Sequence, residues 1–286
     1  MRKFFHYLFV ACLSLTIAAP LHAQEKSKFT ASDWRLGSQA YTFRLFTLEE
    51  TLQKLQSIGV RYIELFPGQQ ISRADSATTH FSVGPKERKR IKDLLKKYGI
   101  TAVCYGVVTG TNEKEWRQIF SFAQEIGVEH INTEPSFGQL KLLDNLCNEY
   151  GIKAALHNHP VPSIYWHPTI ILNQIRERSN MIGVCGDIGH WVRSGLDPIE
   201  CIRALEGRIL GFHFKDLNTF GNRNAHDVPW GTGVNNMAGV LNELARQGFK
   251  GYFSVEYEYK WENNLPEVAE SVAYFNRVVS RIANGQ

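Results

Sequence analysis

The chain has 286 residues, with 32 lysines and arginines against 28 aspartates and glutamates, which gives a formal net charge of +4. Two of the positive charges, Arg2 and Lys3, lie in a leader that we expect to be removed, which lowers the charge to +2. A nearly balanced charge does not supply the basic surface that binding to a phosphate backbone requires. The composition therefore argues against nucleic acid as a partner.

Residues 1–23 have the pattern of a secretory signal peptide. Two basic residues precede an apolar stretch over 4–19, and a small residue, Ala23, stands before the expected cleavage point. The apolar stretch ends at Pro20, so it is short for a membrane span, and we expect no stable membrane insertion. Cys12 is a weak signal for lipid attachment, because the apolar stretch continues past it. The leader predicts an exported, periplasmic protein.

The remaining cysteines show no CxxC spacing, which would be typical of a metal site, and no spacing typical of a disulfide framework. Most of them fall inside segments that we predict to be strands or helices, where a thiol commonly acts as a small apolar group. We therefore predict no disulfide framework for Cys104, Cys147, Cys185 and Cys201.

Helix signals alternate with strand signals along residues 24–286. Helix starts are expected at the capping box that begins at Thr47, at Pro85 and at Asp197, which precedes a proline. Glycines that follow amphipathic stretches and precede apolar residues predict helix ends. These glycines are Gly59, Gly99, Gly127, Gly151 and Gly248.

Between the helices, short apolar runs predict eight strands. They are expected near 36–41, 62–65, 100–105, 130–133, 152–156, 182–185, 209–212 and 252–255. Strands separated by single helices form parallel sheets with right-handed crossovers, and eight such units close a barrel. A doubly wound open sheet is the alternative, but no glycine-rich phosphate fingerprint follows the first strand. The predicted fold is α/β, a single (β/α)8 TIM barrel.

Four predicted strands end in side chains that bind metals. Because the carboxyl ends of all strands open on one face of a barrel, these side chains should converge there and share one divalent cation. Buried charges brought together without a cation would be costly. The predicted ligands are Glu134, Asp187, His213 and Glu256, with Glu258 as an alternative of the same strand parity.

At these positions the sequence resembles the xylose isomerase-like barrel superfamily, which contains sugar isomerases, ketose epimerases, inosose dehydratases and related AP endonucleases. The family pattern has a Glu after the fourth strand, Asp-x-x-His after the sixth, His-x-Lys-Asp after the seventh and a Glu after the eighth. This chain has Glu134, then Asp187 with His190, then His213 with Lys215, and Glu256. Its first predicted strand also looks like that of the family.

The resemblance implies a metal-dependent sugar enzyme. Three carboxylates and one imidazole suit Mn, Mg, Co or Zn, and the metal identity stays open. Such a metal acts as a Lewis acid that stabilises an enediolate beside a sugar carbonyl. Epimerisation requires proton transfer on both faces of the reacting carbon, and the resemblance implies that Glu134 and Glu256 are the catalytic proton carriers.

Seven further residues are candidate contacts to the substrate. Two histidines of the fifth strand have the same parity and should face the barrel mouth, although one of them alternatively orients a metal ligand. For Lys215 the alternative is a solvated salt bridge with Asp216. The long segment 217–233 is read as a lid or specificity loop. The candidates are His190, His157, His159, Lys215, Glu64, Arg223 and Trp230.

The sequence departs from the family's epimerases at Thr219, where those enzymes carry an arginine; Arg223 from the loop is a possible substitute. We therefore predict an isomerase or epimerase that acts on a non-phosphorylated or keto-modified sugar. A lyase or dehydratase that uses the same metal site, on a keto-sugar or an inosose, is an alternative. A sugar-binding barrel without catalysis is a third. The sequence leaves homo-oligomerisation open.

Overall fold

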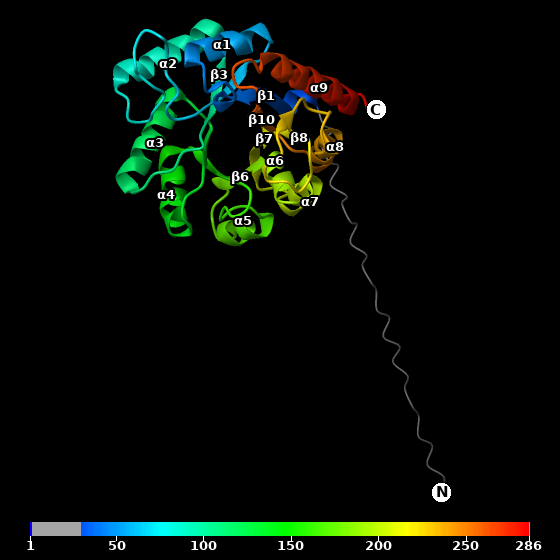
Figure 1. Cartoon of the computed structure of the whole chain (residues 1–286). Coiled ribbons are helices and arrows are strands. Elements are labelled where there is room, and N and C mark those ends of the chain that lie inside the picture. Colours follow the sequence, from blue (N-terminus) through cyan, green and yellow to red (C-terminus); the bar gives the residue numbers. More distant parts are fainter. Residues whose placement is uncertain (2–29, 286) are drawn as a thin grey trace.

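The computed structural model describes residues 30–285 together with Met1, so the predicted leader over 1–23 lies outside the described residues apart from its first residue. Eight parallel strands close into a barrel in the order β1-β10-β7-β6-β5-β4-β3-β2. Helices surround the barrel, with α9 lying across β1 and β10 (Figure 1). The predicted single (β/α)8 TIM barrel is confirmed.

All eight predicted strands are present. The two that extend furthest beyond their predicted ends are β6 and β7, because Asp187 pairs in register with His213 and continues the ladder. These side chains therefore project from ordered strands, and their backbones are fixed by neighbouring strands on both sides. The strands are β1 (Trp34–Gln39), β2 (Tyr62–Leu65), β3 (Thr101–Tyr105), β4 (His130–Thr133), β5 (Lys153–His157), β6 (Ile182–Asp187), β7 (Ile209–Phe214) and β10 (Gly251–Val255).

The helix signals are also confirmed. Thr47 forms the expected capping box with Glu50, and Asp197 accepts hydrogen bonds from the first backbone amides of its helix. The five predicted stop glycines all have the positive φ that glycine adopts readily. None of the described helices is long and apolar enough to cross a membrane. The helices are α1 (Leu48–Ser57), α2 (Pro85–Tyr98), α3 (Glu113–Ile126), α4 (Leu140–Tyr150), α5 (Pro168–Ile175), α6 (Ile188–Arg193), α7 (Pro198–Ala204), α8 (Met237–Gln247) and α9 (Leu265–Ala283), with short 3-10 turns at Ala31–Asp33, Ala40–Phe43 and Phe137–Gln139.

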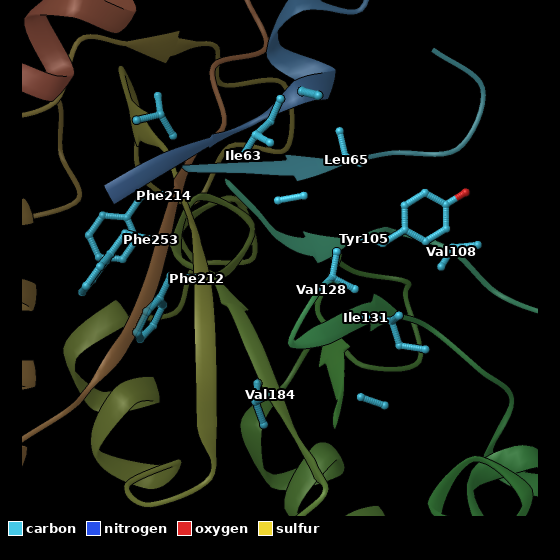
Figure 2. Packing of buried hydrophobic residues seen from close by; sticks show 14 of the residues in the cluster. Ile63, Leu65, Tyr105, Val108, Val128, Ile131, Val184, Phe212, Phe214 and Phe253 are labelled. Carbon is cyan, nitrogen blue, oxygen red and sulfur yellow. The ribbon is translucent and has the colours of Figure 1, made fainter. Parts of the chain in front are cut away.

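The apolar core lies between the barrel wall and the helices. Phe212, Phe214 and Phe253 alternate with inward-facing polar residues along β7 and β10, and their rings pack against one another (Figure 2). This alternation follows from the two-residue period of a strand. It places His213, which lies between two of these phenylalanines, inside the barrel.

The segment after β7 is tied to the barrel. Strands β8 (Asp216–Leu217) and β9 (Asp227–Val228) form a small antiparallel ribbon that overlaps the predicted lid segment 217–233. The buried carboxylate of Asp216 accepts hydrogen bonds from the backbone amides of Leu217, Gly231, Gly233 and Asn235. One aspartate therefore holds the base of the segment.

Asp216→Ala should release this segment, because up to four backbone amides lose their acceptor. We expect a loss of about 3 kcal/mol in the free energy of unfolding. Urea denaturation measures the loss, and limited proteolysis should cut the variant within 217–233 before other sites. Asp216→Asn, which keeps one carboxamide oxygen as an acceptor, should show a smaller loss. Equal stability of Asp216→Ala and the parent chain would contradict this account.

Candidate functional site

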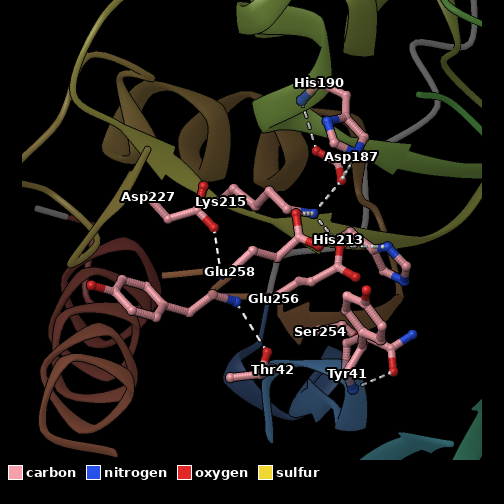
Figure 3. Close-up of polar contacts among 12 residues, drawn as sticks. Tyr41, Thr42, Asp187, His190, His213, Lys215, Asp227, Ser254, Glu256 and Glu258 are labelled. Atoms are coloured by element: carbon pink, nitrogen blue, oxygen red, sulfur yellow. Dashed lines mark hydrogen bonds and ion pairs between the residues drawn. The ribbon is translucent and has the colours of Figure 1, made fainter. Parts of the chain in front are cut away.

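Polar side chains gather inside the barrel at the carboxyl ends of its strands. Asp187 is the last residue of β6, His213 lies in β7, and Lys215 and Glu256 directly follow β7 and β10. Figure 3 shows these side chains pointing toward one another from three strands. The tertiary structure thus brings together three of the four predicted metal ligands, Asp187, His213 and Glu256.

The fourth member of this cluster is His157, at the end of β5. His157, Asp187, His213 and Glu256 are all buried, and each offers a ligand atom within 4.8 Å of those of the others. His157 Nε2 lies 3.7 Å from Asp187 Oδ2, and His213 Nδ1 lies 2.9 Å from Glu256 Oε2. Two imidazoles and two carboxylates form a donor set that divalent transition metals accept.

Each imidazole of the cluster has a carboxylate next to the ring nitrogen that points away from the cluster, and this contact orients the ring. Glu134 Oε1 is 2.8 Å from His157 Nδ1, and Glu64 Oε2 is 2.9 Å from His213 Nε2. An ionised carboxylate only accepts, so each of these nitrogens carries its ring proton. When the rings are neutral, as metal binding requires, the lone pairs lie on His157 Nε2 and His213 Nδ1, which face Asp187 and Glu256 in the cluster. The buried Nε2 of His157 has no hydrogen-bond partner, so the residues fit a divalent metal.

Glu134 lies behind His157 instead of among the four clustered residues. It follows the end of β4, and its carboxylate contacts the Nδ1 atoms of both His157 and His159. Burial raises the pKa of Glu134, but the hydrogen bonds from these two histidines outweigh burial and lower the pKa to about 2. The arrangement differs from the predicted ligand set, because the imidazole of His157 occupies the place that we assigned to Glu134.

The predicted substrate contact at Glu64 is not supported. Glu64 is fully buried within β2, below the cluster, and it accepts hydrogen bonds from Asn132 at 2.8 Å and Ser254 at 2.9 Å as well as facing His213. A carboxylate enclosed on these sides orients His213 and does not reach a substrate. Glu64 lies one residue before the end of β2, and the clustered residues lie at or after the ends of their strands, except His213. This position within the strand is the sequence signal that could have indicated its orienting role.

Lys215 lies inside the cluster, with its side chain 1% exposed. Its Nζ is 2.6 Å from Asp187 Oδ2 and also contacts Glu256 Oε2. Burial lowers the pKa of Lys215, but the nearby carboxylates of Asp187 and Glu256 outweigh burial and raise it. The alternative of a solvated salt bridge with Asp216 is wrong, because the Asp216 carboxylate binds backbone amides elsewhere.

His190 borders the cluster from the first turn of α6. Its Nε2 is 3.4 Å from Asp187 Oδ2, and its Nδ1 is 3.1 Å from Arg193 Nη1. A guanidinium only donates, so Nδ1 accepts and the ring proton lies on Nε2. Sequence reasoning missed Arg193, which also binds Asp227 at 2.9 Å, because an isolated arginine on a short helix carries no distinguishing signal.

A cavity of about 350 Å³ opens above the cluster and is bordered by several predicted site residues, including His157, His159, His190 and Glu256. A wider outer cavity of about 550 Å³ shares His159 and His190 with it and is bordered by Arg223. The size of the inner cavity is in the range of small-molecule sites. His157, at the end of β5, and His159, two residues beyond it, both border the inner cavity, and Arg223 borders the outer cavity.

The predicted substrate contact at Trp230 is wrong. The residue is 3% exposed and packs between Phe214 and Phe275, with ring centroids 5.4 and 6.2 Å apart. It is therefore a core residue that supports the base of segment 217–233. The sequence did not distinguish a substrate contact from a core residue at this position. An aromatic ring in a predicted loop can pack on the apolar surface of a sugar or on that of the core.

Comparisons with known proteins agree with the fold. A search of curated proteins finds no match. An uncharacterized protein from Parabacteroides distasonis is 32% identical, with 86% of this chain and 99% of that chain covered and a TM-score of 0.71. A D-tagatose 3-epimerase-like protein is 19% identical, with 88% and 99% covered and a TM-score of 0.71. The IOLI protein with a bound zinc atom is 17% identical, with 87% and 99% covered and a TM-score of 0.67.

The family model that describes the xylose isomerase-like TIM barrel matches residues 52–278, which is most of the chain. The matched region includes the clustered residues His157, Asp187, His213 and Glu256. The chain belongs to the xylose isomerase-like TIM barrel family.

Proposed function

We propose that this protein is a metal-dependent sugar isomerase or epimerase that acts on a non-phosphorylated or keto-modified sugar through an enediolate. The observation that carries the proposal is the convergence of His157, Asp187, His213 and Glu256 below a cavity. The named neighbours support it, because one is described as epimerase-like and another as holding zinc.

A divalent ion bound by these four residues would supply a Lewis acid that polarises a sugar carbonyl. Two imidazoles in the donor set favour Zn, Mn or Co over Mg, which prefers oxygen ligands. Glu64 and Glu134 hold the imidazoles of His213 and His157 in the orientation that binding requires. Both carboxylates therefore contribute to metal affinity without entering the cluster.

Proton transfer at the carbon beside the carbonyl is assigned to two sides of the cavity. Glu256 borders the cavity and accepts a proton on one side. His159 also borders the cavity and contacts Glu134, and we assign the second proton, on the other face of the carbon, to this pair. His190 also borders the cavity, and we assign it as a hydrogen-bond donor to a substrate oxygen.

His190→Ala should impair turnover and leave the metal in place, because His190 borders the cluster without belonging to it. We expect a loss of roughly 10²-fold or more in the rate, since a positioned hydrogen-bond donor to developing charge is removed. Elemental analysis should still give about one metal ion per chain, as four ligands remain. Loss of the metal would instead show that His190 is itself a ligand.

Export places the substrate outside the cytoplasm in this proposal, where phosphorylated sugars are scarce. The support is the predicted leader over 1–23, with its basic start and apolar stretch. Expression of the full chain followed by cell fractionation and amino-terminal sequencing tests it. A mature protein that begins near Gln24 in the periplasmic fraction is the expected result, and an uncleaved cytoplasmic chain would contradict it.

The substrate is identified by incubating the metal-loaded protein with free sugars and keto-glycosides in deuterated water. An isomerase or epimerase should incorporate deuterium at one carbon beside the carbonyl, and NMR identifies that carbon. A product with a new double bond or carbonyl and one water fewer would instead assign a dehydratase. Binding of a sugar without any C–H exchange would leave a non-catalytic sugar-binding barrel.

A further inference from the structure

The ammonium of Lys215 lies on the same oxygen atoms that the metal cluster uses. Asp187 Oδ2, which faces His157 Nε2, is 2.6 Å from Lys215 Nζ. Glu256 Oε2, which faces His213 Nδ1, also contacts this ammonium. A single positive charge thus joins both carboxylates of the cluster, and Figure 3 shows it between them.

The fold holds Lys215 in this position. The stem of the side chain passes over Gly189, where an added Cβ would come within 2.6 Å of Lys215 Cβ. Asn235 Nδ2 donates to the backbone carbonyl of Lys215 at 2.7 Å, which fixes the start of the side chain. The contact is therefore built by three separate segments and is not an incidental surface pair.

A second acceptor for the ammonium lies close by. Glu258 Oε2 is 3.6 Å from Lys215 Nζ, and the Glu258 side chain is 25% exposed. Glu258 borders both the inner and the outer cavity, and it is not one of the four clustered residues. A lysine stem has four rotatable bonds and can move its charge over this distance without changing the backbone.

We propose that the Lys215 ammonium competes with a divalent cation for Asp187 Oδ2 and Glu256 Oε2, and that Glu258 receives the ammonium when the metal binds. The inference rests on the proposed metal site. Two buried carboxylates without a cation would cost several kcal/mol, so one positive charge or the other must remain with them. The ammonium keeps its proton throughout and changes only its partner.

The exchange has a consequence for substrate binding. When the ammonium pairs with Glu258, it lies at the cavity wall, where it can donate to a substrate oxygen. Metal binding and the presentation of this donor are then coupled. Lys215 thereby becomes a residue that adjusts metal affinity, in addition to its predicted contact with the substrate.

The test is a Mn²⁺ titration of the metal-stripped protein by calorimetry, with the full mature chain and three variants. Lys215→Met, which keeps the stem and removes the charge, should bind Mn²⁺ about tenfold more tightly. Glu258→Gln should bind it about fivefold more weakly, because the displaced ammonium has lost its acceptor. In the double variant the Glu258→Gln change should have no further effect, because it acts through Lys215.

A matched control is Lys89→Met, which removes a charge from an exposed ion pair on α2 and should leave the Mn²⁺ affinity unchanged. Two outcomes would overturn the competition but leave the proposed function intact. One is additive effects of the two changes in the double variant. The other is an unchanged Mn²⁺ affinity of Lys215→Met while the parent chain binds Mn²⁺. If none of these proteins binds Mn²⁺, and none binds Zn²⁺ or Co²⁺ in the same titration, both the competition and the proposed function are overturned. If Lys215→Met does not fold, as judged by circular dichroism, the Glu258→Gln affinity decides, and a value equal to that of the parent overturns the proposal.

Discussion

Glu256→Gln and Glu134→Gln should each strongly slow proton exchange on one face of the reacting carbon. An amide cannot accept the proton, although its oxygen still reaches a neighbouring metal or imidazole. General acid–base catalysis contributes roughly 10²–10⁴-fold to a rate, and we expect losses in this range. The measurement is deuterium incorporation into the substrate identified by the sugar panel, followed by NMR for each epimer separately.

The two variants should differ in which epimer still exchanges, because the proposed mechanism assigns Glu256 and the Glu134–His159 pair to opposite faces of the reacting carbon. Metal occupancy must be equal before rates are compared, since Glu256 belongs to the cluster and Glu134 orients His157. Glu262→Gln, at an exposed position, is the matched control and should leave the rate unchanged. Full activity in either metal-loaded variant would remove that glutamate from the mechanism.

Glu64→Ala should destabilise the protein by about 3 kcal/mol, because three buried donors lose their acceptor. The change leaves His213 Nε2, Asn132 Nδ2 and Ser254 Oγ without their shared acceptor inside the barrel. It also removes the group that directs His213 Nδ1 toward the cluster, so metal affinity should fall. Urea denaturation of the metal-free protein measures the change in the free energy of unfolding without a contribution from bound metal.

Glu64→Gln is the matched variant, because it keeps the shape and one acceptor oxygen while removing the charge. It should lose less stability than Glu64→Ala but should also bind metal more weakly, since a neutral amide raises the basicity of His213 less than a carboxylate does. Equal stability of the parent chain and Glu64→Ala would show that water or another side chain satisfies these groups. In that case Glu64 does not organise the cluster.

The sequence by itself determined the architecture and the location of the site. Apolar runs separated by capped helices predicted all eight barrel strands, because the strand and helix periods and the glycine ends are local properties of the chain. The rule that parallel strands end on one face then placed Asp187, His213 and Glu256 together. Each of these inferences depends on position along one strand and not on distances between strands.

Only the tertiary structure decided which polar groups contact which. Glu134 and His157 both lie at strand ends, and the cluster contains His157 because its imidazole reaches between Glu134 and Asp187. Trp230 lies in a predicted loop, yet it packs into the core. Lys215 and Asp216 are adjacent, yet their side chains point to different partners. Such outcomes depend on separations of a few ångströms between side chains from different strands, which the register and twist of the closed barrel set and a one-dimensional pattern does not contain.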